Sequence, residues 1–255
     1  MHKLSVLIPC YNSEKVIRSA LESVKWADEI LICDSYSTDR TLEICRNYTD
    51  RIIQHEYINS AKQKNWAIPQ CRHDWVLAVD TDEVLEDGLK EEIQYWLKRD
   101  SIPYDGFRIR SKNFIYGKWI KHARLYPEYH IRLFQKDRGK FQDREVHAHL
   151  IVPGAVGTLT HHLLHNGFKD VSSWVIKIER YTRYECTERL KRRHPFQISK
   201  HFLGTPAVFC DRFFLKLGFL DGYRGFLVSA LDAFYYFLIG VRLWEAIHSK
   251  EKFSS

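Results

Sequence analysis

Residues 75–83, Trp-Val-Leu-Ala-Val-Asp-Thr-Asp-Glu, decide the fold of this chain. The first five are apolar and include two valines, which is typical of a buried β-strand. Three acids, Asp80, Asp82 and Glu83, follow at once. Because side chains alternate along an extended chain, we expect Asp80 and Asp82 to project to one side and share a divalent cation. Such hard oxygen ligands favour Mg²⁺ or Mn²⁺ over zinc.

A lone Asp-x-Asp also occurs at solvated strand ends, so the neighbouring sequence has to decide between the two interpretations. The first hundred residues alternate short apolar strands with amphipathic helices. We expect strands at 4–8, 29–33, 51–54 and 75–79, and helices near 16–24, from 38, at 60–68 and at 87–98. This alternation predicts an α/β fold with a mainly parallel, Rossmann-like sheet flanked by helices.

Polar groups follow three of the expected strands. They are Pro9-Cys10-Tyr11-Asn12 after the first, 34–39 after the second and 80–83 after the fourth. Ligands of such sheets bind beyond the carboxyl ends of the strands, so we expect these groups to converge on one cleft. Helix capping by Asn12 or Ser37 explains each polar residue singly, but it does not explain why acids follow the strands.

The composition excludes a disordered chain and limits the number of domains. With 255 residues, 45% hydrophobic and 28% charged, the chain suits one large domain or one domain with an appendage. The six cysteines are scattered and form no Cys-x-x-Cys pair, which indicates reduced thiols in the cytoplasm. The apolar run before Pro9 is too short for a signal peptide.

The positive charge is concentrated in one region. The formal net charge of the whole chain is +7. The segment from Ile176 to Arg224 contains eleven basic and five acidic residues, which gives it a net charge of +6. This region also precedes Gly225–Trp244, an apolar segment interrupted by Asp232. Its apolar core, 226–241, is shorter than the roughly 20 residues that span a bilayer, and the charge of Asp232 lies inside it. We therefore favour interfacial or re-entrant helices over the alternative, a buried helical hairpin.

With these segments in order, the chain resembles the family 2 glycosyltransferases of GT-A fold, and within them the branch that adds glucose or another hexose to the lipopolysaccharide inner core. The matching segments are LSVLIPCYNSEKVIRSALESV, ADEILICDSYSTDRTLEI, KQKNWAI, DWVLAVDTDEVL, REVHAHL, HHLLHNGF and LGFLDGYRGF. Together they extend over essentially the whole chain.

The resemblance implies a donor site. It assigns nucleotide-sugar contacts to Pro9, Tyr11, Asn12, Asp34, Ser35, Lys64 and Asp80, and metal contacts to Asp82 and His165. Asp34 would accept the imide N–H of uracil, Asp80 would meet the ribose, and Lys64 a phosphate or the nucleotide. The alternative for Lys64 is an exposed helix lysine. Many relatives carry glycine where this chain has Tyr36, so the loop after the second strand is expected to be tighter or differently aimed.

The general base is expected among two acids of one loop. The resemblance favours Glu145, with Asp143 in reserve, and the alternative for each is a surface acid. Where relatives commonly show Val-His-Glu, this chain has Val146-His147-Ala148. The histidines His161 and His162 are as easily structural as ligating.

The function implied is an inverting glycosyltransferase that moves a hexose, with glucose leading, from a UDP-sugar to lipopolysaccharide core or a lipid-linked saccharide, with Mg²⁺ or Mn²⁺. Residues 1–170 would form the transferase domain, and the basic extension 171–255 would contact acceptor or membrane at the inner face of the cytoplasmic membrane. An acid-lined cleft argues against nucleic acid. The alternatives are a metal-dependent phosphohydrolase using His147 and His149, and a non-catalytic nucleotide-sugar-binding protein at the membrane.

Overall fold

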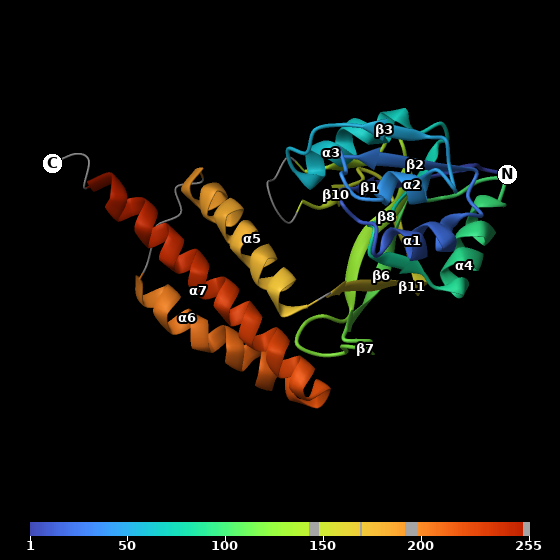
Figure 1. Ribbon diagram of the computed structural model, residues 1–255. Coiled ribbons are helices and arrows are strands. Elements are labelled where there is room, and N and C mark those ends of the chain that lie inside the picture. The colour runs from blue at the N-terminus through green and yellow to red at the C-terminus, as the bar shows by residue number, and fades with distance from the viewer. Residues whose placement is uncertain (143–147, 169, 192–197, 252–255) are drawn as a thin grey trace. The chain divides into compact units, whose positions relative to one another are not determined.

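The protein divides into two compact units, which are described separately. The structure, a computed structural model, describes residues 1–142, 148–168, 170–191 and 198–251, the last range without the side chains of 198–202 and 249–251. Unit 1 comprises Met1–Lys112 and Pro127–Gly167, and unit 2 comprises Asn113–Tyr126 and Phe168–Ser255. Figure 1 shows the elements of both units.

A mixed sheet with the strand order β3-β2-β1-β4-β8-β6-β11-β5 organises unit 1. Its parallel half consists of β1 (Leu4–Cys10), β2 (Glu29–Asp34), β3 (Ile52–Gln54) and β4 (Trp75–Ala78). Its second half contains β5 (Glu83–Leu85), β6 (Gly106–Ile115), β8 (Glu128–Gln135) and β11 (Val156–Phe168). The pairs β4–β8, β6–β8 and β5–β11 are antiparallel. The parallel arrangement therefore holds for the four strands predicted from the first hundred residues, and β5 and the later strands extend the sheet through antiparallel pairs.

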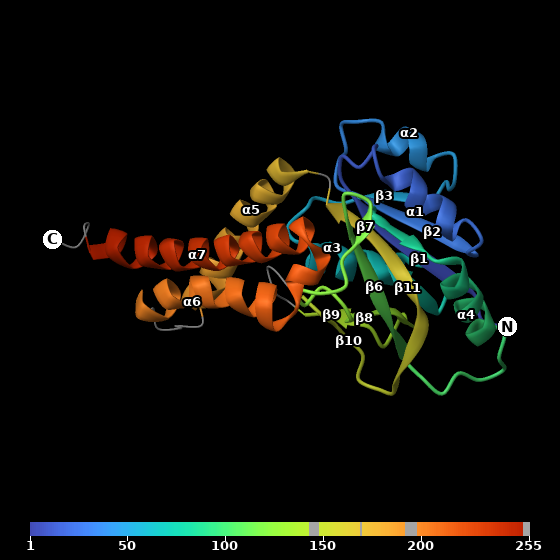
Figure 2. The same cartoon turned by 90° about the horizontal axis from the view of Figure 1, so that it is seen from below.

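Helices cover both faces of this sheet (Figure 2). On one face, α1 (Ile17–Val24) and α4 (Asp87–Leu97) pack Leu21 and Ile93 against Val6 and Leu77. On the other, α3 (Ser60–Ala67) and the 3₁₀ turn Ile68–Gln70 pack against Leu7 and its neighbours. A short helix, α2 (Thr41–Cys45), follows β2. The strands β1 and β2 are buried on both faces, which explains why their sequences read as continuous apolar runs.

Small strand pairs complete the β-structure. β7 (Lys118–Trp119) pairs with β6, and β9 (Lys140–Phe141) pairs with β10 (Leu150–Ile151) in a separate two-stranded sheet.

Unit 2 is built from helices and the segment 113–126. It contains α5 (Val171–Lys191), α6 (Ile198–Cys210), a π-helical turn (Asp211–Leu215), a 3₁₀ turn (Gly218–Asp221) and α7 (Tyr223–Glu251). The segment 113–126 packs Ile115 and Ile120 with Val228 of α7 in a small apolar cluster. The predicted functional division at residue 170 stays a prediction, although the compact units assign 113–126 to the helical part.

Candidate active site

The carboxyl ends of β1, β2 and β4 lie at one edge of the sheet, because these strands are parallel neighbours. The loops after β1 and β2 are joined there. The Asn12 N–H donates to Ser37 Oγ at 2.9 Å, and Asn12 Oδ1 accepts from the Thr38 N–H at 2.8 Å. Pro9 lies opposite Cys33 just before this junction. The predicted convergence of the polar strand ends is confirmed for these loops.

Two tyrosines at this edge are exposed to solvent. Tyr11 and Tyr36 are 58% and 57% exposed, one and two residues after the buried strands β1 and β2. Tyr36 has φ +59°, the left-handed region that glycine adopts at lower cost. The chain thus makes a turn that favours glycine while presenting a tyrosine ring to solvent. A planar exposed ring is suited to stacking on a nucleobase.

Asp34 is fully buried, and its carboxylate bonds inside the protein. It accepts from the Ser37 N–H at 3.0 Å, from Ser37 Oγ at 2.5 Å and from Gln54 Nε2 at 3.0 Å. The neighbouring Ser35 is also buried and accepts from Gln63 Nε2 at 2.5 Å. Both residues hold the loop after β2 in place. A contact from Asp34 to a uracil N–H stays a prediction, and it would require one of these bonds to be exchanged.

Lys64 projects from α3 into a charged cluster at the end of β4. Its side chain is 6% exposed and its Nζ lies 2.8 Å from Asp80 Oδ1, so the alternative of an exposed helix lysine is wrong. Asp80 Oδ2 lies 3.2 Å from Arg132 Nη1 of β8. The other guanidinium nitrogen, Arg132 Nη2, lies 2.5 Å from Glu83 Oε1. Lys64, Asp80, Arg132 and Glu83 therefore form a series of ion pairs in which cations and carboxylates alternate.

The cluster keeps Asp80 ionised. Burial alone would raise the pKa of Asp80, but the charges of Lys64 and Arg132 outweigh it and hold that pKa well below the usual range. Burial raises the pKa of Glu83, and the charge of Asp80 adds to this while Arg132 opposes it. Asp80 is 37% exposed and Glu83 only 3%, so Asp80 is the carboxylate that a ligand can reach.

Sequence reasoning missed two residues of this site, Arg132 and Gln63. Arg132 lies on β8 and its side chain is 12% exposed. The available signal was a charge between Ile131 and Leu133, two apolar residues, because buried charges are rare unless they are paired. Gln63 immediately precedes Lys64 on α3 and donates to Ser35, so one helix supplies two groups to this edge.

Asp82 and His165 form a second pair. Asp82 Oδ2 lies 3.6 Å from His165 Nε2, and the two side chains are 25% and 30% exposed. The residue His165 pairs opposite Glu83 where β11 runs antiparallel to β5. The predicted metal ligands are therefore brought together, although they are 83 residues apart in sequence.

The extended backbone assumed for Asp80 and Asp82 is wrong, and their sharing of one cation stays a prediction. β4 ends at Ala78, and the acids lie on a turn in which the Glu83 N–H donates to Asp80 O at 3.0 Å. Asp80 consequently bonds Lys64 and Arg132, whereas Asp82 lies beside His165. Side-chain alternation applies only to extended backbone, and the chain turns before the first acid.

The pair Asp82 and His165 fits a divalent cation that also binds a diphosphate. Donor atoms on adjacent positions of an octahedral site at ~2.1 Å from the ion lie about 3.0 Å apart, so the observed 3.6 Å needs only a small adjustment. Among the described residues, no group of three or more His, Cys, Asp or Glu side chains is arranged to hold a metal. Mg²⁺ ordinarily takes one or two protein ligands and completes its shell with water and phosphate oxygens.

Comparison with known proteins decides the family. Residues 5–159 match the family model described as Glycosyl transferase family 2. The chain belongs to this family. The predicted resemblance is thereby confirmed, and the mixed α/β sheet with its C-terminal apolar helix is the GT-A-type fold expected for this glycosyltransferase.

Individual relatives extend over nearly the whole glycosyltransferase. The lipopolysaccharide core biosynthesis glycosyltransferase LpsC of Rhizobium meliloti is 26% identical across 95% of this chain and 92% of its own length. An uncharacterized glycosyltransferase of Rickettsia typhi is 28% identical across 96% and 88%. Among solved structures, Staphylococcus aureus TarS 1-349 in complex with UDP-GlcNAc superimposes with a TM-score of 0.49 and 16% identity, across 97% and 92% of the two chains.

The candidate bases of the glycosyltransferase, Glu145 and Asp143, lie outside the described residues, as does His147. Their roles therefore stay predictions. The nearby His149 is described, and its ring lies 6.2 Å from that of His130.

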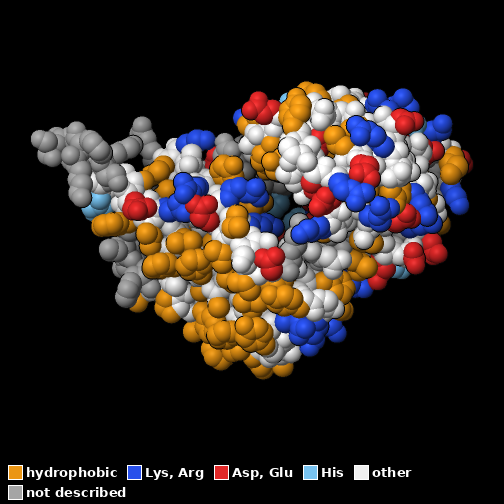
Figure 3. Space-filling view, viewed as in Figure 1, with side chains coloured by type: hydrophobic (Ala, Val, Ile, Leu, Met, Phe, Trp, Pro, Cys, Tyr) orange, Lys and Arg blue, Asp and Glu red, His pale blue; other side chains and the backbone are white. Residues whose placement is uncertain are grey.

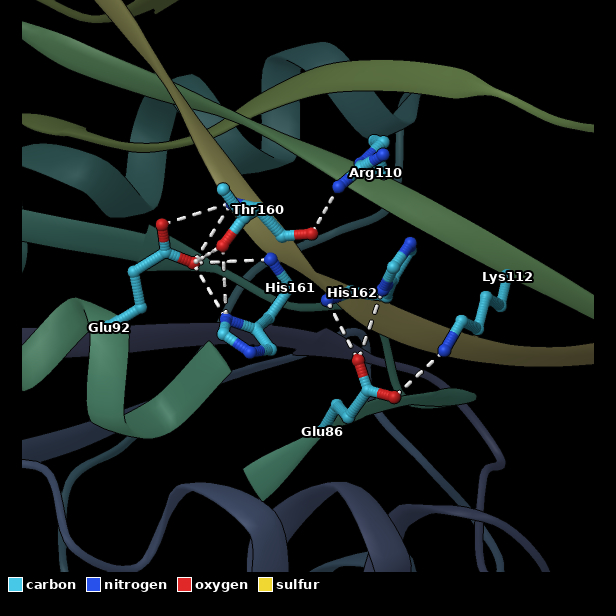
Figure 4. Close-up of polar contacts among 7 residues, drawn as sticks. All are labelled: Glu86, Glu92, Arg110, Lys112, Thr160, His161 and His162. Atoms are coloured by element: carbon cyan, nitrogen blue, oxygen red, sulfur yellow. Dashed lines mark hydrogen bonds and ion pairs between the residues drawn. The ribbon is translucent and has the colours of Figure 1, made fainter. Parts of the chain in front are cut away.

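The two histidines that the sequence left open as structural or ligating, His161 and His162, have carboxylate partners (Figure 4). His161 Nδ1 lies 3.0 Å from Glu92 Oε2 of α4, and His162 Nδ1 lies 3.1 Å from Glu86 Oε2. Lys112 Nζ bonds the second oxygen of Glu86 at 2.8 Å. Burial lowers the pKa of His162, with Lys112 adding to the effect, although the bond to Glu86 opposes it. These contacts fasten β11 to the region of α4, so both histidines are structural in this glycosyltransferase.

Proposed function

We propose that the protein transfers a hexose from a UDP-sugar to a saccharide acceptor of lipopolysaccharide core, with inversion at the anomeric carbon. One observation supports the proposal above all: a glycosyltransferase domain holds two charged groups at its site. The first consists of Lys64, Asp80 and Arg132, and the second of Asp82 and His165. The acceptor class rests on similarity to LpsC, a protein named for lipopolysaccharide core biosynthesis, over nearly the full length of both chains. UDP-glucose is the leading donor.

The donor's nucleoside would bind between exposed rings and fixed polar groups. Tyr11 offers a ring to the uracil, and Asn12 and Ser35 shape the loops around it. The ionised Asp80 accepts hydrogen bonds from ribose hydroxyls, because Lys64 and Arg132 hold its carboxylate in one orientation. Preformed contacts of this kind lower the ordering cost of binding.

The diphosphate would meet the pair Asp82 and His165 through a bound Mg²⁺ or Mn²⁺. When bound, the ion supplies Lewis-acid stabilisation of the negative charge that develops on the leaving UDP. On the acceptor side, Glu145 or Asp143 would accept the proton of the attacking hydroxyl. Attack from the face opposite the departing UDP inverts the anomeric centre. Such an acceptor places the reaction at the cytoplasmic face of a membrane.

The test uses purified protein with Mn²⁺ or Mg²⁺, a panel of UDP-sugars and lipopolysaccharide core acceptor. We expect acceptor-dependent UDP release, and Asp82→Asn should lower it at least about 100-fold because one of two metal-binding side chains is lost. Asp137→Asn, which changes an exposed acid on a turn, is the matched control and should keep full activity.

Each alternative has its own signature in the same assay. Full activity in Asp82→Asn refutes the metal assignment. Hydrolysis of phosphoesters without sugar transfer supports the phosphohydrolase. Tight UDP binding with no turnover on any acceptor supports the non-catalytic binding protein.

A further inference from the structure

The outward face of α7 is apolar over most of its length. Tyr223, Phe226, Phe234, Phe237 and Trp244 are 74%, 46%, 39%, 46% and 44% exposed. Their spacings of three, eight, three and seven residues return to the same side of a helix. From Tyr223 to Trp244 this stripe is roughly 32 Å long at the usual helical rise. Large apolar stripes of this kind mark a surface that contacts something other than water.

Between Tyr223 and Leu243, the charged side chains of α7 point the opposite way, into unit 2. All three charged residues between Tyr223 and Leu243 bond to protein. Arg224 Nε donates to Ile115 O at 2.9 Å, Asp232 Oδ2 lies 3.1 Å from Arg212 Nε, and Arg242 Nε donates to Thr182 Oγ1 at 3.0 Å. A helix on the surface of a water-soluble protein has the reverse arrangement, with charges outward and apolar groups inward. The polarity of α7 is therefore inverted.

The apolar surface continues from α7 onto α6 and the turns between them. Leu203, Phe214, Leu215, Phe219 and Leu220 are 65%, 54%, 75%, 45% and 56% exposed. Figure 3 shows apolar side chains gathered over α6 and α7. We call these five residues and the five of the α7 stripe the apolar face. Such a face is far larger than the scattered single apolar residues that need no explanation.

Lysines are fixed beside this surface. Lys118, Lys121 and Lys216 are exposed, and the first two belong to the segment 113–126. Buried Asp221 holds that segment in place, because its Oδ2 accepts from the N–H groups of Lys121 and His122 at 3.0 and 2.8 Å. The Ala123 N–H also donates to Lys216 O at 2.9 Å. The lysines and the segment that carries Leu215 and Leu220 are thus parts of one hydrogen-bonded structure.

We propose that the apolar face lies in the headgroup region of an anionic lipid bilayer, so that unit 2 is an interfacial membrane anchor. Apolar side chains enter the acyl boundary, and the lysines meet lipid phosphates.

The arrangement favours lying on the membrane over crossing it. The helix region Tyr223–His248 is long and apolar enough to span. Crossing would draw Arg224, Asp232 and the charged side chains of the segment 113–126 toward the hydrocarbon, where charges are costly. In the interfacial position these groups stay above the acyl chains. Lysines beside the apolar face also disfavour its burial against a second copy of the chain, because like charges would approach each other.

Cys210 of α6 gives a selective reporter. It is exposed, whereas the other five cysteines are buried, so a thiol-reactive environment-sensitive dye reacts there first. With vesicles of phosphatidylglycerol and phosphatidylethanolamine, we expect a blue shift of the dye and quenching by shallow rather than deep spin-labelled lipids. Vesicles of phosphatidylcholine alone should give a much smaller shift. Stronger quenching by the deep lipids would overturn the interfacial position.

Flotation with the same vesicles tests the residues. The triple variant Leu215→Ser, Leu220→Ser, Phe226→Ser should bind at least about tenfold less, because three side chains lose their apolar burial. The double variant Lys118→Ala, Lys216→Ala should bind anionic vesicles at least about tenfold less than the wild type, because each lysine contributes separately to binding. Ile151→Ser removes an equally exposed apolar side chain from β10 and should bind normally.

Two further readouts decide between membrane and protein partners. Stabilisation of each variant by UDP against heating reports that unit 1 is folded, and it stays interpretable even if the proposed transfer reaction is wrong. Undiminished flotation of the folded triple variant overturns the proposal. So does a wild-type protein that does not float and sediments as a dimer that the triple variant converts to monomers.

Discussion

Arg132 pairs with two carboxylates. We expect its replacement to lower the stability of the folded protein before it weakens ligand binding. Arg132→Met leaves Glu83 almost fully buried without its cation, which costs about 3 kcal/mol of unfolding free energy. Adding Glu83→Gln should restore part of that loss, because the buried charge is removed with its partner. Urea unfolding at pH 7 measures both effects.

The control for Arg132 is Arg108→Met on the neighbouring strand β6, where the side chain is exposed. Its unfolding free energy should change by less than about 0.5 kcal/mol. Equal stability of Arg132→Met and wild type would contradict the structural role given to this cation.

Site residues with a local signature were predictable from sequence, and those defined by distant contacts were not. The pair Asp82 and His165 followed from resemblance, and the structure brings the two together. Arg132 lies on a strand whose neighbours in the sheet, β4 and β6, come from far along the chain. Nothing near it in sequence tells which carboxylates it meets. The different partners of Asp80 and Asp82 were missed because a turn begins just where strand alternation was assumed.

At the scale of elements, α3 positions both Gln63 and Lys64 through its N-terminal cap. Asn59 Oδ1 accepts from the Lys62 N–H at 2.8 Å. Asn59→Ala should cost about 1 kcal/mol of stability and raise the KM for the sugar donor, because the helix that holds Lys64 loses its first bond. Asn59→Asp keeps an acceptor at the cap and should leave both quantities near their wild-type values. A donor KM that rises equally in both variants would argue against the cap as the cause.

The sequence predicted the early elements well, since each has a clear period and a turn at its end. The expected strand 29–33 and helix 87–98 differ from β2 and α4 by one residue. The segment 205–220 is irregular and offered no such signal. Leu217 adopts φ +55°, and a π turn and a 3₁₀ turn replace continuous helix after Cys210. Tertiary contacts such as those of Asp221 select this conformation. The helical periodicity of the sequence does not indicate such contacts.

At the scale of the whole molecule, the segment 113–126 makes truncation of the chain after residue 170 unfavourable for folding. A chain shortened to 1–170 keeps Ile115, Ile120 and Ala123 but lacks Val228 and Asp221, with which this segment packs and bonds. We expect that shortened chain to aggregate during gel filtration. Replacing 114–125 in it by a short Gly-Ser linker should give a monomer, because the uncovered apolar cluster is then absent. A stable monomer without the linker would contradict this view of unit 2.

The distribution of thiols carries a practical consequence for handling the protein. Five cysteines are shielded from solvent, and Cys210 alone is open to it. In aerated buffer this sulfur finds no accessible partner within its own chain, so oxidation joins two molecules or forms a sulfenic acid. Covalent pairs would then accumulate on storage and imitate natural self-association. Fresh reductant, or Cys210→Ser, keeps measurements of molecular mass free of that artefact.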